Sequence, residues 1–199
     1  SKRNRTHTMK VVRTFVAVLI AENLKERISR VQERIKKFAS DVKWVSPENL
    51  HVTLKFLGGV PEDRIEQVCS TVEEAAGSVP PFELSLSRLG AFPSPRNARV
   101  VWIGIEDGRD ELVSLARRVD DSLARHGFER ESRPFAAHVT IGRTRQGRRP
   151  DGLAEGLQEA PSEDLGRQKV ERVVMMRSDL MPQGPVYTPL KVVDLAGDG

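Results

Sequence analysis

A strand–helix–strand pattern occurs twice in this sequence, and each copy ends in a strand that carries a His-x-Thr motif. His51 and His138 begin the two motifs and lie 87 positions apart. Phe15 and Trp102, each in the strand that opens its copy, are separated by the same number of positions. A repeat of this length predicts two similar lobes related by a pseudo-twofold axis, and it argues against a solenoid.

The spacing of apolar residues predicts the secondary structure of each copy. Strands are expected at 14–20, 51–57, 82–89, 99–105, 135–141, 170–177 and 190–195, and helices at 24–38, 61–76, 112–123 and 151–159. Short links between these elements favour antiparallel sheets with helices on their outer faces. The expected fold class is therefore α+β, with two pseudo-symmetric lobes, each an antiparallel sheet with helices packed outside, and an active-site cleft between them.

The repeat also sets the expected domain organisation. Residues 9–199 are expected to form a single bilobal domain, with its motifs at 51–54 and 138–141. Residues 1–8 are polar and basic, and a natural start at Met9 would make them a tag remnant or a disordered arm.

Composition narrows the class of protein. No apolar run approaches the length of a transmembrane helix, so no membrane partner is expected. The single cysteine, Cys69, excludes an intrachain disulfide and suits a cytoplasmic location. A net charge of +4 allows a polyanionic partner without requiring one. The sequence has no phosphate-binding glycine loop, no dinucleotide-binding signature and no clustered Cys/His set, so neither cofactor nor metal is expected.

The two motifs carry residues suited to acid–base chemistry at phosphorus. Side chains alternate along a strand, so His51 and Thr53 are expected on one face, and His138 and Thr140 likewise. Two facing imidazoles could take a proton from an attacking water and give one to a leaving oxygen, because histidine titrates near working pH. The hydroxyls could donate hydrogen bonds to phosphate oxygens. A single His-x-Thr is more often structural, and duplication alone could preserve a structural motif.

Residues that follow the motifs allow two interpretations each. By strict alternation Lys55 would share the face of His51 and could bind phosphate, but a solvated lysine fits equally well. Phe56 would then face away from His51 and pack in the core. A run of arginines after the second motif could follow an RNA backbone or form a solvated loop. These are Arg143, Arg145, Arg148 and Arg149.

Five stretches resemble the 2H phosphoesterase superfamily, which is named for two H-x-[ST]-x motifs. They are RTFVAVLI, ENLHVTLKFLGGV, GAFPSPRNARVVWIGI, HVTIGRTR and RSDLMPQGPVYTPL, and together they cover nearly the whole chain from Arg13 onward. Within the superfamily the sequence is most similar to the RNA 2′,3′-cyclic phosphodiesterases, also known as 2′-5′ RNA ligases. The resemblance implies a bilobal fold, and nothing in the sequence argues against a monomer. The implied partner is an RNA that ends in a 2′,3′-cyclic phosphate, such as a tRNA fragment.

The resemblance also implies a role for each site residue. His51 would donate a proton to the leaving 3′ oxygen, and His138 would accept one from the attacking water, which leaves a 2′-phosphate. Thr53 and Thr140 would hold the phosphate. Arg143 matches an arginine often found after the second motif, although strict alternation would turn it away from the His138 face. Reverse 2′-5′ joining of RNA is implied as well.

Three alternatives remain open from the sequence. A relative could act on small cyclic nucleotides or ADP-ribose cyclic phosphates. The chain could also be an RNA-binding module without catalysis, which the intact His and Thr pairs disfavour. A metallohydrolase with the histidines as ligands is disfavoured because the motif strands carry no carboxylates.

Overall fold

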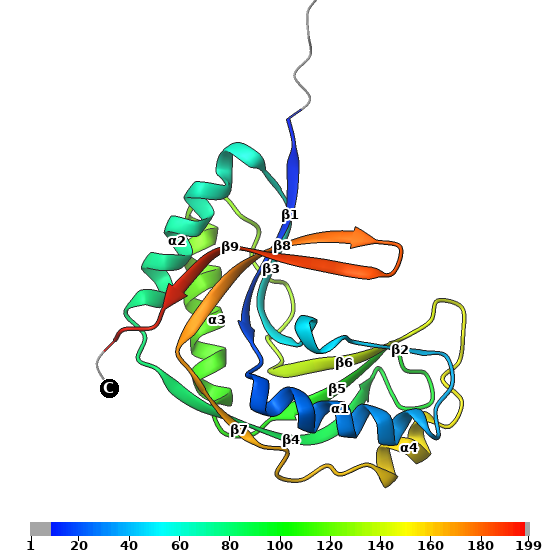
Figure 1. The fold of residues 1–199 in the computed structure, drawn as a ribbon. Helices are drawn as coiled ribbons and strands as arrows, with labels where there is room; N and C mark the ends of the chain where they lie inside the picture. The colour runs from blue at the N-terminus through cyan, green and yellow to red at the C-terminus, as the bar shows by residue number, and fades with distance from the viewer. Residues whose placement is uncertain (1–8, 198–199) are drawn as a thin grey trace, which may run out of the picture.

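A computed structural model describes residues 9–197 of the chain, which fold into two antiparallel sheets with helices on their outer faces (Figure 1). The first sheet has the strand order β3-β1-β8-β9, and the second has the order β2-β6-β5-β4-β7. The strands are β1 Val11–Leu19, β2 Val42–Trp44, β3 His51–Pro61, β4 Phe82–Phe92, β5 Val100–Ile105, β6 His138–Thr144, β7 Arg167–Val170, β8 Arg172–Met181 and β9 Gly184–Asp194. The expected α+β fold with two lobes is confirmed. The arm proposed at 1–8 lies outside the described residues.

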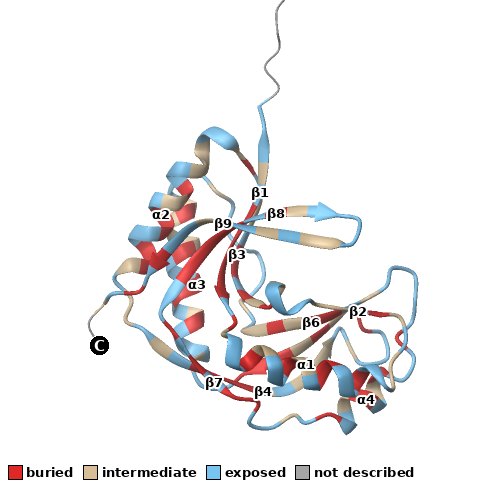
Figure 2. Ribbon diagram, in the orientation of Figure 1, coloured by how far each residue is buried: buried red, intermediate tan, exposed pale blue. Residues whose placement is uncertain are grey.

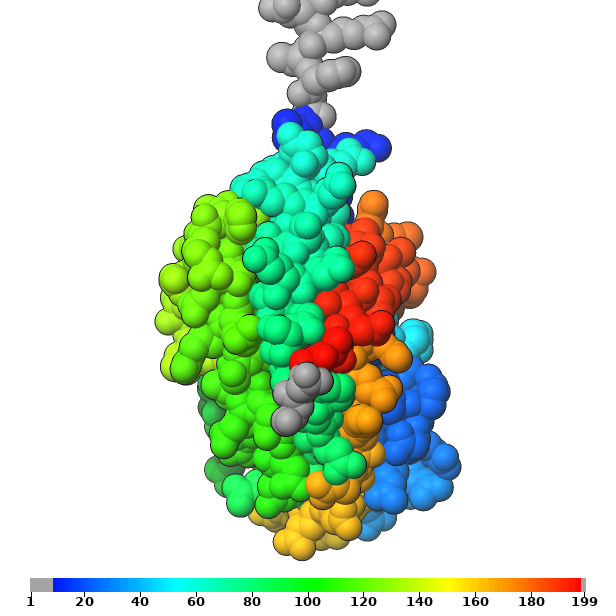
Figure 3. Space-filling model, turned by 90° about the vertical axis from the view of Figure 1, so that its left-hand side faces the viewer, coloured from blue at the N-terminus to red at the C-terminus, as the bar shows by residue number. Residues whose placement is uncertain are grey.

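The helices cover the outer faces of the sheets. They are α1 Glu22–Lys36, α2 Ile65–Gly77, α3 Arg109–Arg125 and α4 Leu153–Glu159, with 3-10 turns at Pro47–Asn49 and Glu62–Arg64. α2 and α3 lie against the first sheet, and Figure 3 shows them side by side next to the end of β9. α1 lies against the second sheet, and α4 packs against α1 (Figure 1). No helix within residues 9–197 combines the length and the hydropathy needed to span a bilayer.

The first helix of each repeat packs against the sheet of the other repeat. α1 follows β1 of the first sheet, yet the Gln32 amide on α1 donates hydrogen bonds to the carbonyls of Val45 and Ile141 beside the second sheet. α3 follows β5 of the second sheet, yet Arg118 on α3 donates to the Ala75 carbonyl in α2. The buried apolar side chains accordingly form one main cluster through both lobes (Figure 2). The two lobes therefore do not have separate cores.

A β-bulge interrupts the alternation of β3 just after Thr53. Thr53 lies opposite Ala17 and Lys55 lies opposite Val16, so Leu54 is an extra residue without a partner of its own. Leu54 and Lys55 are both buried. A bulge of this kind re-aims the side chains that follow it.

β6 has the same irregularity at the equivalent place. Thr140 lies opposite Trp102 and Gly142 lies opposite Val101, so Ile141 is the extra residue. Leu54 and Ile141 are 87 positions apart, like the two histidines. The repeat therefore includes the bulge as well as the motif.

The expected elements differ from the observed ones mainly at their ends. β6 begins at His138, because 135–137 forms a loop instead of the start of a strand. β3 continues through the two glycines to Pro61, and the helix expected from Pro61 begins at Ile65. β2 and β7 were not expected, since three or four residues are too few to show a periodicity.

Candidate active site

The two motif histidines have the same hydrogen-bond arrangement. His51 Nδ1 lies 2.7 Å from the carbonyl oxygen of Asn49, and His138 Nδ1 lies 2.7 Å from the carbonyl oxygen of Ala136. A carbonyl can only accept a hydrogen bond, so Nδ1 carries a proton in both rings. In the neutral imidazole the lone pair is then on Nε2. Both rings are thus oriented with Nε2 as the nitrogen available for proton transfer.

Aromatic rings and a hydroxyl surround His51 on the face of the first sheet opposite the helices. Its Nε2 lies 2.9 Å from the hydroxyl of Thr53, as alternation predicts. Its ring centroid is 4.9 Å from that of Phe15 and 5.4 Å from that of Tyr187. The Asn49 amide donates to the Pro185 carbonyl at 3.0 Å, which ties the turn before the motif to β9. These contacts hold the imidazole in one orientation.

Burial lowers the pKa of His51 below its ordinary value. The positive charges of Arg143 and of protonated His138 lower that pKa further, and the hydrogen bond to the Asn49 carbonyl partly opposes the shift. Arg143 and His138 belong to β6, which lies beside β3 where the two sheets meet. The charges on β6 therefore act on the histidine of β3, so the two motifs share one electrostatic environment.

The bulge in β6 turns Arg143 toward this site. Arg143 lies opposite Val100, one position beyond the buried pair of Gly142 and Val101. Its side chain is exposed, and its charge adds to the burial that lowers the pKa of His51. Burial raises the pKa of Tyr187, and the charge of Arg143 partly opposes that rise. Strict alternation would have pointed Arg143 away, so the extra residue in the strand accounts for its placement.

The expectation that Lys55 shares the face of His51 is wrong. Its cross-strand partner Val16 packs in the main core, and its ammonium donates to Asp120 Oδ1 on α3 and to the Glu129 carbonyl, both at 2.6 Å. The side chain is only 3% exposed. Lys55 is therefore a buried ion-pair partner, because the bulge at Leu54 reverses the alternation.

The bulge has the opposite effect on Phe56, and its expected place in the core is also wrong. Phe56 lies opposite Phe15 and so shares the face that carries His51. The Phe56 ring is 44% exposed, with the Arg13 guanidinium 4.7 Å from its centroid. The sequence had suggested that Phe56 packs in the core, whereas its ring and the Arg13 guanidinium lie on the face of the sheet that carries His51.

Sequence reasoning missed two aromatic residues near the motifs. Tyr187 contacts His51 and Phe15, and only its place in a family-like stretch distinguished it. Trp102 lies opposite Thr140 on one side and Gly90 on the other, and its indole covers Gly90 so closely that an added Cβ would overlap it. The sequence had matched Trp102 with Phe15, but the strand register matches it with Ala17, because Ala17 lies opposite Thr53 and Trp102 lies opposite Thr140.

A hollow of about 410 Å³ lies beside His138 on the second sheet. Its lining is Ser87, Arg88, Phe92, Val100, Trp102, Gly104, Arg109, Ala136, Ala137 and His138. Phe92, Val100 and Trp102 are part of this lining, so the hollow offers an apolar surface next to His138.

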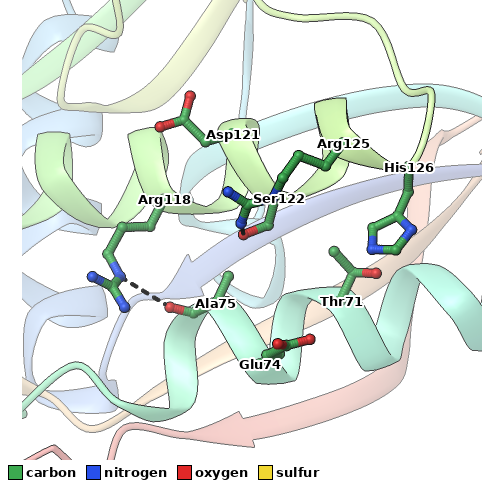
Figure 4. A pocket seen from close by; sticks show the side chains of 8 residues that line it. All are labelled: Thr71, Glu74, Ala75, Arg118, Asp121, Ser122, Arg125 and His126. Carbon is green, nitrogen blue, oxygen red and sulfur yellow. Dashed lines mark hydrogen bonds between the residues drawn. The ribbon is translucent and has the colours of Figure 1, made fainter.

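A different hollow lies between α2 and α3, on the outer face of the first sheet (Figure 4). Its volume is about 420 Å³, and Arg118 and His126 line it. His126 closes α3, since its backbone N–H bonds to the Leu123 carbonyl and its ring lies beside Gln67. This hollow contains no motif residue. Within residues 9–197 no group of three or more His, Cys, Asp or Glu side chains is arranged to hold a metal ion.

A sequence model described as LigT like Phosphoesterase matches the chain twice, over residues 18–102 and 103–187. The chain belongs to the LigT-like phosphoesterase family. The two matches begin 85 positions apart. The strand register gives the same offset, because Val18 lies opposite Val52 and Ile103 lies opposite Val139. Across this LigT-like fold the motif strands are thus offset by 87 positions and the opening strands by 85.

Curated relatives of this LigT-like chain are named RNA 2′,3′-cyclic phosphodiesterase. The protein from Methanothermobacter thermautotrophicus is 39% identical over 184 residues, which cover 92% of this chain and 99% of that protein. The protein from Aquifex aeolicus is 35% identical over 194 residues, which cover 95% of this chain and 100% of that protein. Among solved structures, TT0787 of Thermus thermophilus matches with a TM-score of 0.80 and 27% identity, over 94% and 100% of the two chains. E. coli LigT complexed with 3′-AMP matches with a TM-score of 0.73 and 26% identity, over 94% and 99%.

Proposed function

We propose that this chain hydrolyses the terminal 2′,3′-cyclic phosphate of RNA to a 2′-phosphate, with His51 as proton donor and His138 as proton acceptor. The observation that carries the proposal is the matched pair of imidazoles, each with Nδ1 on a carbonyl 2.7 Å away. This arrangement leaves Nε2 of each ring as the nitrogen that can gain or lose a proton in acid–base catalysis. The names of the curated relatives support the substrate.

The reaction is an in-line displacement at phosphorus. His138 Nε2 takes a proton from water as its oxygen bonds to phosphorus. The bond from phosphorus to the 3′ oxygen breaks, and His51 Nε2 protonates that oxygen. The product has a 2′-phosphate and a 3′-hydroxyl, His51 is left neutral and His138 is left protonated. Exchange with solvent resets both rings, so protons balance over one turnover.

Substrate binding would give His51 the proton that it must donate. Burial and neighbouring positive charge lower its pKa in the free protein, which favours the neutral ring. A cyclic phosphate carries one negative charge, and an anion beside an imidazole favours the protonated form. The donor state would therefore form mainly in the complex.

Hydroxyl and guanidinium groups would hold the phosphate between the histidines. Thr53 is within hydrogen-bond distance of His51, and Thr140 occupies the equivalent position in the second motif. Arg143 is exposed and influences His51 electrostatically. Donors aimed at non-bridging oxygens stabilise the charge that builds in the transition state. Thr53→Val, which keeps the shape of the side chain, should lower kcat by about 10²–10³.

We also propose that hydrolysis needs no metal ion and that the site can run in the joining direction. With a 5′-hydroxyl of a second RNA in place of water, the same proton transfers would form a 2′-5′ phosphodiester. The proposal requires only that His138 deprotonate a hydroxyl instead of water. Both reactions use the strain of the five-membered cyclic phosphate as their driving force.

The test is to incubate the protein and a chelator with an oligoribonucleotide that ends in a 2′,3′-cyclic phosphate. The expected product is a 2′-phosphate, identified by resistance of the end to a 3′-phosphate-specific phosphatase. Loss of turnover with chelator would reject the metal-independent mechanism. A 3′-phosphate product would reverse the roles of the two sides of the site. Turnover of cyclic mononucleotides but not oligonucleotides would favour a small-molecule substrate instead.

A further inference from the structure

A large arginine-lined hollow adjoins the candidate active site on the second sheet. Its volume is about 870 Å³. We call it the arginine hollow, after the five exposed arginines that line it beyond Arg143. They are Arg99, Arg133, Arg145, Arg148 and Arg149.

Backbone hydrogen bonds give the arginine hollow a defined shape. The Thr144 N–H donates to the Arg99 carbonyl at 3.0 Å, and the Arg145 N–H donates to the Asp41 carbonyl at 2.8 Å. The Arg148 N–H closes a turn onto the Arg145 carbonyl at 3.0 Å. The stretch that carries Arg145, Arg148 and Arg149 is thus bonded to that of Arg99, and Arg133 comes from the loop before β6. The solvated-loop interpretation of the arginine run does not explain why Arg99 and Arg133 join it.

The charges of the arginine hollow are not neutralised within the described part of the protein. Several arginines elsewhere are paired with carboxylates, including Arg30 with Glu26 and Arg167 with Asp107. Within residues 9–197 none of the five arginines of the hollow lies within 4.0 Å of a carboxylate oxygen. Gathered like charge raises the local concentration of anions and favours an anionic partner.

The arginine hollow continues into the apolar hollow beside His138. Phe92 and Val100 line both hollows. Phe92 is 60% exposed, and Trp102 also lines the apolar hollow. Single-stranded nucleic acids bind to surfaces that combine cationic side chains for the backbone with aromatic faces for the bases. A surface of this kind therefore runs from His138 past Phe92 to the arginines.

We propose that the arginine hollow binds the backbone of the nucleotides on the 5′ side of the cyclic phosphate, with Phe92 as a stacking surface between the two hollows. The inference rests on the proposed function, which places a 3′-terminal phosphate at His51 and His138. A cyclic phosphate ends its strand, so every other nucleotide must leave the site in one direction. The arginine hollow lies along such an exit and carries the complementary charge.

The experiment compares a cyclic mononucleotide with a hexanucleotide that ends in the same cyclic phosphate. The test variant is Arg145→Ala/Arg148→Ala/Arg149→Ala, which leaves Arg143 in place. For the hexanucleotide, kcat/KM should fall about ten- to hundredfold, and the slope of log(kcat/KM) against log salt should become shallower by about 2, or about 0.7 per lost phosphate contact. For the mononucleotide, kcat/KM should stay within about twofold of wild type, because no phosphate reaches the arginines.

A matched control removes three charges from the opposite side of the same lobe. Arg30→Ala/Arg34→Ala/Lys37→Ala changes exposed residues at the outer face and end of α1 and should leave both substrates and the salt slope unchanged. An equal fall for the two substrates, or a fall in the control as large as in the test variant, would overturn the inference. Anisotropy of a 5′-labelled hexanucleotide with a 2′-phosphate end reports binding without turnover. If wild type turns over neither substrate but its binding depends on the three arginines, the proposed function fails while the arginine hollow stands.

Discussion

Removal of the Asp120 carboxylate should destabilise the protein strongly, because that carboxylate neutralises a buried lysine. Lys55 is 3% exposed, and its ammonium lies 2.6 Å from Asp120 Oδ1 and 2.6 Å from the Glu129 carbonyl. Asp120 also accepts a hydrogen bond from the Glu131 N–H at 3.2 Å. Loss of one partner of a buried ion pair costs about 3–5 kcal/mol. Because Asp120 is 18% exposed and water can reach the pair from that side, the lower end, about 3 kcal/mol, applies to Asp120→Ala.

Thermal unfolding followed by circular dichroism measures this cost. In a protein of this size about 3 kcal/mol corresponds to a fall in Tm of about 6–12 °C. Asp121→Ala is the matched control on the same helix, since the pair of Asp121 with Arg130 is exposed and surface pairs contribute little. Lys55→Met/Asp120→Leu removes both charges and should recover most of the lost stability.

The single variant Lys55→Met distinguishes a structural role of Lys55 from a role in phosphate binding. Lys55→Met should lower Tm but keep phosphodiester turnover at temperatures where it is folded, because the side chain points away from His51. A Tm for Asp120→Ala as close to wild type as that of Asp121→Ala would refute the buried pair. Loss of turnover in Lys55→Met without loss of stability would return Lys55 to the phosphate site.

Two further predictions concern the charge and the packing of the site. Arg143→Gln should lower kcat/KM about tenfold or more and move the alkaline limb of its pH profile to higher pH. The Arg143 charge lowers the pKa of His51, so removal of the charge raises that pKa. Arg143→Lys keeps the charge and should leave the alkaline limb at its wild-type pH. Alkaline limbs at the same pH in the two variants would contradict this reasoning. Gly90→Ala should destabilise the protein by about 1–3 kcal/mol in urea unfolding, because its Cβ would overlap Trp102. Gly77→Ala, which meets open space, should be neutral or slightly stabilising, and equal effects would count against the packing of Trp102 on Gly90.

The sequence predicted the parts of this fold that depend on local periodicity. Alternation correctly placed Thr53 beside His51, because no bulge lies between them. It failed for Lys55, Phe56 and Arg143, which all follow a bulge. A bulge inserts one residue without changing the hydrophobic character of the segment, so the apolar pattern does not reveal it.

The exchange of helices between the lobes could not be predicted either. Periodicity shows that a helix such as α1 has one apolar face, but not which sheet that face will cover. The contacts that decide it are distant in sequence, such as the hydrogen bond from Gln32 to the Ile141 carbonyl. Similarly, Trp102 gained its place beside Thr140 from strand register, which depends on both strands together.

Single-turnover hydrolysis by histidine variants tests the central claim most directly. His51→Ala and His138→Ala should each lower the rate for an oligoribonucleotide 2′,3′-cyclic phosphate by about 10²–10⁴. The double variant should be little slower than the worse single variant, because the two rings act in one step. His126→Ala, at the end of α3, should keep the wild-type rate. A rate within about tenfold of wild type for either motif variant would contradict paired acid–base catalysis.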